Sequence, residues 1–173
     1  MRMKKITDEV FYADQDIVEV SKEDIEFLKK KALQNERKRC RLCTHKDVND
    51  KVHEMIIVHT KDTYVRPHKH LDKSEAFHII EGEADVVILD DDGTVRKVIS
   101  MGEYSSGKNF YYRLSEPFYH TLLIKSDIIV FHEATKGPFS KDDTLFAQWS
   151  PEEGDISAQR KFIKELEKSI KNH

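Results

Sequence analysis

Two histidines and a glutamate near the middle of the chain have the types and the spacing of metal ligands. His68 and His70 are separated by one residue, and Glu75 follows after a short connection. Alternate residues of a β-strand point to the same face, so both imidazoles would project together from a strand. Glu75 would begin the next strand and add a carboxylate oxygen, while Gly82 would allow the tight turn that follows. The segment therefore predicts a metal site where two strands meet.

The elements that would position these residues form a β-rich domain with a helix at each end. Residues 53–149 contain short β-rich runs separated by turn residues, which favours an antiparallel sandwich or barrel. Residues 21–39 read as a helix that begins with a capping box of Ser21 and Asp24. We divide the chain into four parts: an N-terminal extension (1–20), a helix with a basic segment (21–52), a barrel (53–150) and a C-terminal helix (151–173).

The composition argues against two classes of partner. The formal net charge is only −3, so no basic field favours nucleic acid. No apolar run approaches the ~18–20 residues that span a bilayer, and the first residues lack the apolar stretch of a secretory signal. Cys40 and Cys43 lie outside a thioredoxin-like context, so we interpret them as ordinary thiols rather than a zinc or redox pair. We expect a cytoplasmic protein without a membrane or nucleic-acid partner.

The run from His68 to Gly82 reads H-x-H-x4-E-x6-G and resembles the first motif of the cupin superfamily. Asp62 stands where that motif normally opens with a glycine. Cupins carry a second motif that supplies another histidine, and the resemblance assigns it to His120, although the other positions of this motif depart from the usual pattern. The resemblance implies a mainly β, cupin-type double-stranded β-helix (jelly-roll) barrel. The implied metal ligands are His68, His70, Glu75 and His120.

This ligand set favours one divalent transition-metal ion per chain, such as Fe, Zn, Ni or Mn, because borderline nitrogen and oxygen ligands suit these ions better than Ca. Four protein ligands on an octahedral ion would leave two positions for water or substrate, which permits Lewis-acid chemistry or activation of oxygen. The same four ligands would close a tetrahedral Zn site and make it structural. The identity of the ion stays open.

A narrower resemblance covers segments outside these motifs. Residues 37–45, 63–70 and 137–154 are similar to the WbuC family of cupin-fold metalloproteins, with departures at Arg41 and Gln148. That family contains small bacterial proteins with a bound divalent metal, some encoded among genes for surface polysaccharide synthesis. The resemblance implies a small-molecule ligand, and cupins are frequently homodimers.

Further residues are candidates for ligand binding. Basic residues at a predicted helix end and beyond would form an anion site, or simply a solvated helix end where cations favour the helix dipole: Arg37, Arg39, Arg41 and His45. Tyr64 and Arg66 alternate with the histidines and would face the pocket, unless Pro67 disrupts the alternation and places them on the barrel rim.

The resulting functional hypothesis is a metal-binding cupin protein that acts on or binds a small polar metabolite, a sugar derivative of surface polysaccharide metabolism. An enzyme of this kind would be an isomerase, an epimerase or a mononuclear metal dioxygenase. The general base is unknown, with Tyr64 and Glu133 as the candidates. The alternatives are a non-catalytic ligand-sensing or regulatory module and a metal-free structural domain.

Overall fold

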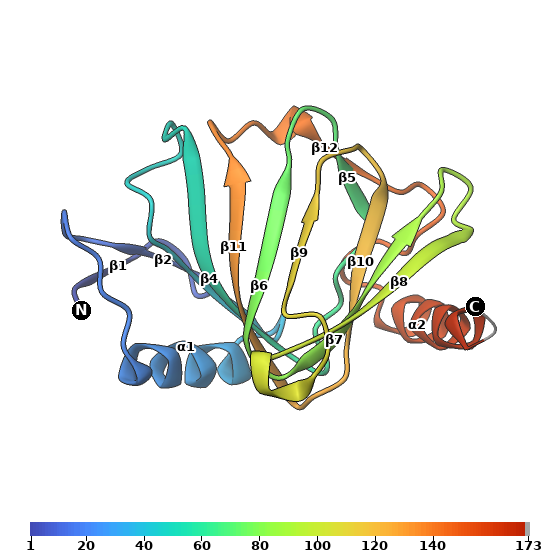
Figure 1. Ribbon diagram of the computed structural model, residues 1–173, viewed down its shortest axis with the longest axis horizontal. Helices are drawn as coiled ribbons and strands as arrows, with labels where there is room; N and C mark the ends of the chain where they lie inside the picture. Colours follow the sequence, from blue (N-terminus) through green and yellow to red (C-terminus); the bar gives the residue numbers. More distant parts are fainter. Residues whose placement is uncertain (172–173) are drawn as a thin grey trace.

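The computed structural model of the chain describes residues 1–171 and consists of two β-sheets packed face to face, with one helix on the outside of each (Figure 1). Seven strands form the larger sheet, in the order β1-β2-β3-β4-β11-β6-β9, and five form the smaller one, in the order β12-β5-β10-β7-β8. Pairing between the named strands is antiparallel except for the parallel pair β2–β3. This jelly-roll barrel confirms the predicted fold class.

The strands of the larger sheet are β1 (Met3–Lys5), β2 (Val10–Ala13), β3 (Arg39–Cys43), β4 (Val52–Thr60), β11 (Ile128–Lys136), β6 (Glu75–Glu81) and β9 (Tyr111–Leu114). Those of the smaller sheet are β12 (Thr144–Phe146), β5 (His68–His70), β10 (Tyr119–Ile124), β7 (Glu83–Leu89) and β8 (Val95–Gly102). The helices are α1 (Lys22–Gln34) and α2 (Ile156–Ile170), and two short 3-10 helices lie at Tyr104–Ser106 and Lys141–Asp143.

The main hydrophobic core lies between the two sheets and receives alternate residues from both. Phe131 of β11 is 1% exposed, and its ring centroid lies 4.9 Å from that of Phe77 on β6. Val86 of β7 and Leu122 of β10 enter the same core from the smaller sheet. Gly82 has a φ of 84° in the β6–β7 turn, as the sequence predicted for a tight turn at this position.

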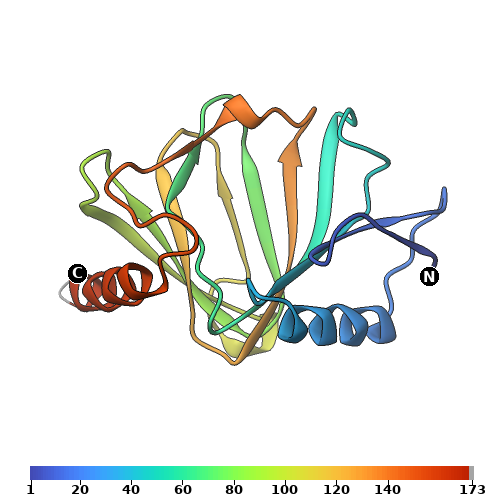
Figure 2. The same cartoon turned by 180° about the vertical axis from the view of Figure 1, so that it is seen from behind.

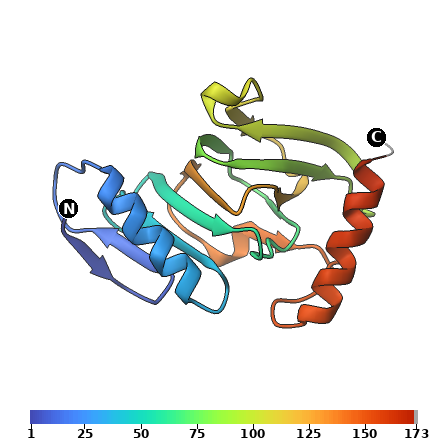
Figure 3. The same cartoon turned by 90° about the horizontal axis from the view of Figure 1, so that it is seen from below.

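Helix α1 covers the outer face of the larger sheet, as the view from below shows (Figure 3). Its capping box is formed, because the Ser21 side chain accepts from the Asp24 amide and Asp24 accepts from the Ser21 amide. Leu28 and Ala32 are completely buried against that face. The helix ends at Gln34 rather than near residue 39, and the residues that follow become β3.

Helix α2 covers the outer face of the smaller sheet at the other end of the molecule (Figure 2). Leu166 is 5% exposed and packs with Val87 and Leu123. Trp149 packs in the same cluster, and its indole nitrogen donates to the carbonyl of Asp91 at 2.9 Å. Within residues 1–171, no helix is both long and apolar enough to span a bilayer.

Candidate metal centre

Three histidines converge from two adjacent strands of the smaller sheet. His68 and His70 project from β5, and the antiparallel register places His120 of β10 directly opposite His68. One ring nitrogen from each of the three lies within 4.8 Å of the others. The ring centroids of His68 and His120 are 4.4 Å apart, and those of His68 and His70 are 5.1 Å apart. These three side chains could hold a metal ion.

Hydrogen bonds from Nδ1 to backbone carbonyls orient the imidazoles of His68 and His120. Nδ1 of His68 lies 2.8 Å from the Arg66 carbonyl, and Nδ1 of His120 lies 3.1 Å from the Phe118 carbonyl. A carbonyl oxygen can only accept, so each of these nitrogens carries the proton when the ring is neutral. The Nε2 lone pairs are then free for a ligand bond, which is how histidines are commonly arranged around metal ions.

Glu75 reaches the histidines from the first position of β6 in the facing sheet. The carboxyl side chain is 3% exposed, and its Oε1 accepts a hydrogen bond of 2.7 Å from the Tyr112 hydroxyl. Nε2 of His120 lies 2.9 Å from the same oxygen, and Nε2 of His70 lies 3.4 Å from Oε2. The buried Nε2 of His120 nevertheless lacks a hydrogen bond of acceptable geometry. A cation between these lone pairs would satisfy both groups, so the residues fit a metal ion.

Burial and mutual charge set the ionisation of this cluster. Burial lowers the pKa of His68 to about 3, and the neighbouring His120 contributes in the same direction. Burial opposes ionisation of Glu75, but the contact with His120 outweighs it and holds the pKa of Glu75 well below its usual value. Burial lowers the pKa of His120, but the Glu75 carboxylate outweighs burial and raises this pKa above its usual value. Because metal ions bind neutral imidazole and ionised carboxylate, an ion at this site would displace the proton that Glu75 favours on His120.

Tyr64 and Arg66 contact the segment that follows β12. The hydroxyl of Tyr64 donates to the carbonyl of Pro151 at 3.0 Å, and burial raises the pKa of Tyr64 to about 12. Nε of Arg66 donates to the Ser150 hydroxyl at 3.3 Å, and its guanidinium lies over the Phe146 ring. Both side chains therefore hold residues 146–151 against the barrel.

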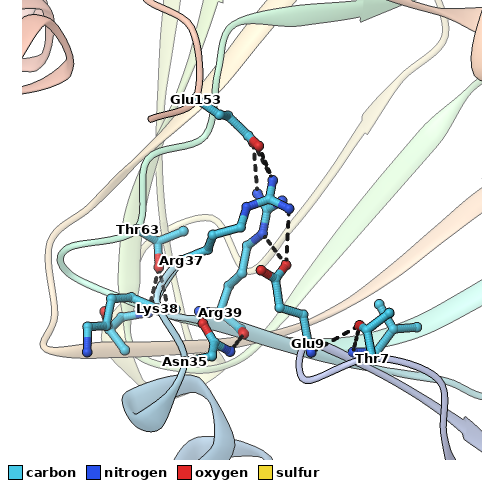
Figure 4. A network of polar contacts seen from close by, with 10 residues as sticks. Thr7, Glu9, Asn35, Arg37, Lys38, Arg39, Thr63 and Glu153 are labelled. Carbon is cyan, nitrogen blue, oxygen red and sulfur yellow. Dashed lines mark hydrogen bonds and ion pairs between the residues drawn. The ribbon is translucent and has the colours of Figure 1, made fainter. Parts of the chain in front are cut away.

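Arg37 and Arg39 form an ion-pair network that joins the N-terminal part of the chain to the C-terminal tail (Figure 4). Both guanidinium groups pair with the carboxylates of Glu9 and Glu153, and the Arg39–Glu9 distance is 3.0 Å. Two cations face two anions here, so the charges in this network balance. Exposed pairs of this kind contribute at most about 1 kcal/mol each.

His45 is separated from this network by the length of β3. Arg39 lies opposite His59 at one end of β4, whereas His45 contacts the backbone of Glu54 near the other end. The His45 ring is buried and stacks on His53 with centroids 4.0 Å apart. The structure does not bring His45 together with Arg37 and Arg39, because an unexpected strand extends the chain between them.

Cys40 and Cys43 lie on opposite faces of β3. Cys40 packs beneath α1 and Cys43 packs between the sheets. Both are free thiols, and burial raises the pKa of Cys40 to about 12. Residues separated by three positions in a strand cannot share a face, which is consistent with two ordinary thiols.

Two residues near the centre did not stand out as site residues in the sequence. Tyr112 belongs to β9, a strand that the turn pattern did not reveal, and it contacts Glu75. Thr144 belongs to the short β12, and its hydroxyl oxygen lies 3.1 Å from Nδ1 of His70. Sheet pairing brings these residues to the site, and no local pattern in the sequence encodes it.

We expect the substitution Thr144→Val to weaken metal binding by about 10- to 100-fold, as for other losses of a hydrogen bond to a ligating histidine. Valine keeps the shape of threonine but removes the oxygen 3.1 Å from Nδ1 of His70. Competition with a chromogenic chelator measures the affinity. Thr94→Val, on the exposed β7–β8 turn, is the matched control. Equal affinities in Thr144→Val and wild type would show that this contact does not orient His70.

Comparison with known proteins supports the fold and adds a family-level similarity. Residues 20–101, just under half of the chain, match a domain of unknown function, DUF6016. No curated protein sequence matches significantly. The barrel superposes on CapF, crystallised with 3-isopropenyl-tropolone, with a TM-score of 0.52 and 14% identity over 65% of this chain and 32% of that chain. It also superposes on the DMSP lyase DddQ of Ruegeria pomeroyi DSS-3, with a TM-score of 0.50 and 13% identity over 66% of this chain and 54% of that chain.

The chain therefore has a cupin-type jelly-roll barrel, with three histidines that could hold a metal ion. It spans less than two thirds of the length of both solved structures. Identities this low show the shared fold and carry no information about substrate.

Proposed function

We propose that the protein binds one divalent transition-metal ion through His68, His70, His120 and Glu75, and that it uses this centre to act on or bind a small polar metabolite. The observation that supports this most strongly is the arrangement of donors. One ring nitrogen from each of the three histidines lies within 4.8 Å of the others. Nε2 of His120 is buried beside the Glu75 carboxylate and has no hydrogen bond of acceptable geometry to any described residue. Retaining such a cluster without a ligand would cost folding free energy.

The bound ion would supply Lewis-acid polarisation of a substrate oxygen, or oxygen chemistry if it is redox-active. The chain would supply orientation and proton transfer. Glu133 fits a proton-transfer role better than Tyr64. It lies two residues after the buried Phe131, so it shares the inner face of β11, and it is opposite Phe77 of the core. Burial raises the pKa of Glu133 to about 8, and the Glu75 carboxylate adds to the rise. The Tyr64 hydroxyl is already bonded to Pro151.

We further propose that the metabolite is a sugar derivative of surface polysaccharide metabolism. Its support is the resemblance of residues 63–70 and 137–154 to the WbuC family. A homodimer and a cytoplasmic location belong to the same proposal.

A direct test incubates metal-loaded protein with sugar phosphates and nucleotide sugars. Product formation is followed by NMR, and thermal stability is measured in parallel. We expect at least one sugar derivative to be converted, with conversion lost in His68→Ala and kept in His78→Ala, whose side chain is exposed on the other face of its strand. Stabilisation without conversion would favour the ligand-sensing alternative. Neither conversion nor stabilisation by any of these compounds would contradict a role in sugar metabolism.

A further inference from the structure

Arg41 differs from its two arginine neighbours because, within residues 1–171, no carboxylate forms an ion pair with it. Residues alternate along β3, with Cys40 and Leu42 packed beneath α1 and Cys43 in the core between the sheets. Arg41 is two residues before Cys43, so it lies on the same, inner face of the larger sheet. Arg37 and Arg39 are neutralised by glutamates, whereas in the described part of the chain no carboxylate lies within ion-pair distance of Arg41.

The strand register places the exposed Arg41 on the inner face of the sheet that carries Glu133 and Glu75, whereas the three histidines project from the facing sheet. Arg41 pairs with Ile57, and Ile57 pairs with Phe131, the inner-face residue next to Glu133 on β11. Glu133 is diagonal to Glu75 across the β11–β6 pair, a separation of roughly 7–8 Å between Cα atoms. Burial raises the pKa values of Tyr12 and Cys43, and the positive charge of Arg41 opposes part of this rise. Arg41 therefore acts electrostatically on both side chains.

We propose that Arg41 is the anion-recognition residue of this barrel and that it binds the carboxylate of a small hydroxy acid, such as a sugar acid, whose oxygens at the other end lie at the histidine centre. The inference rests on the proposed metal site and specifies the class of metabolite. A guanidinium group forms paired hydrogen bonds with a planar carboxylate. The Arg41 charge acts on Glu9 and Glu133, but no carboxylate of the described residues forms an ion pair with it. Its single charge matches that of a carboxylate, whereas a phosphate dianion would need a second cation, and Arg37 and Arg39 are already paired.

Calorimetric titration with glucuronate and with neutral glucose tests this assignment on metal-loaded protein. We expect glucuronate to bind more tightly than glucose to the wild type, and Arg41→Gln to weaken glucuronate by about 10- to 100-fold, the range for a hydrogen-bonded charge. Arg41→Lys should retain part of the affinity, because it keeps the charge but not the paired geometry. Arg160→Gln, on the exposed surface of α2, is the matched control and should not change binding.

Glucuronate binding that does not exceed glucose binding, or that is unchanged in Arg41→Gln, would overturn the assignment. Glucose 6-phosphate serves as a second probe, and preferential binding of this dianion through Arg41 would overturn the choice of a carboxylate. The metal affinity of each variant is measured separately and should equal that of the wild type. Failure of the wild type to bind metal would contradict the proposed function itself, whatever the outcome for Arg41.

Discussion

His120→Ala is expected to weaken metal binding by more than about 100-fold, because it removes a direct ligand, whereas loss of an outer hydrogen bond already costs about 10- to 100-fold. His120 is 2% exposed and lies between His68 of β5 and Glu75 of the facing sheet. The substitution also leaves the buried Glu75 carboxylate with fewer partners, so activity that depends on the metal should fall with the metal content. Chelator competition and elemental analysis measure the effect.

Two comparisons separate loss of a ligand from loss of the fold. His78→Ala removes a histidine of β6 that faces outward, and it should keep the metal affinity of the wild type. His120→Gln keeps more of the side-chain volume and should bind metal as poorly as His120→Ala while unfolding closer to the wild-type denaturant concentration. Metal binding by His120→Ala at wild-type affinity would remove His120 from the ligand set.

Phe131→Ala is expected to lower the free energy of unfolding by about 3–5 kcal/mol. The ring is 1% exposed at the centre of the core, packs 4.9 Å from Phe77 and lies 5.5 Å from the His59 ring. Truncation removes apolar contacts from both sheets and leaves a cavity that the rigid strands can close only in part. Equilibrium denaturation in urea measures the change.

Ile17→Ala is the control for this prediction, because Ile17 is 78% exposed and its truncation should change stability by less than about 0.5 kcal/mol. A loss below about 1 kcal/mol in Phe131→Ala would mean that the two sheets are not held together by this core. In that case the packing of the two sheets would not explain why Glu75 of the larger sheet lies beside the histidines of the smaller sheet.

The residues of the candidate centre are predictable from the sequence to different degrees. His68 and His70 follow from strand periodicity, because i and i+2 share a face in any strand. Glu75 was predicted from its place after a short connection, at the start of the next strand. His120 required the cupin resemblance, since nothing local near residue 120 indicates a ligand. Tyr112 and Thr144 escaped notice because β9 and β12 are short and become strands only by pairing with β6 and β5.

The basic segment shows why charge alone is a poor guide to a binding site. Arg37 and Arg39 stood out as an anion site, but the fold brings Glu9 and Glu153 to them from distant parts of the chain. These long-range partners have no signature in the sequence. Arg41 belonged to the same expected anion site, and in the described residues it is the arginine of this segment without a carboxylate partner.

The N-terminal region shows a similar limit. The capping box of Ser21 and Asp24 and the apolar stripe of Leu28 and Ala32 were predictable, because capping and helical periodicity are local. The end of α1 and the addition of β1 and β2 to the sheet were not. Strand β2 is recruited by parallel pairing with β3, which depends on the tertiary structure.

The central claim is tested most directly by an anomalous difference map from crystals of metal-loaded protein, recorded at the absorption edge of the bound ion. We predict one peak per chain, bonded to Nε2 of His68, His70 and His120 and to a Glu75 oxygen at about 2.0–2.2 Å. A peak elsewhere in the molecule, or one from which His120 and Glu75 are beyond bonding distance, would contradict the proposed centre.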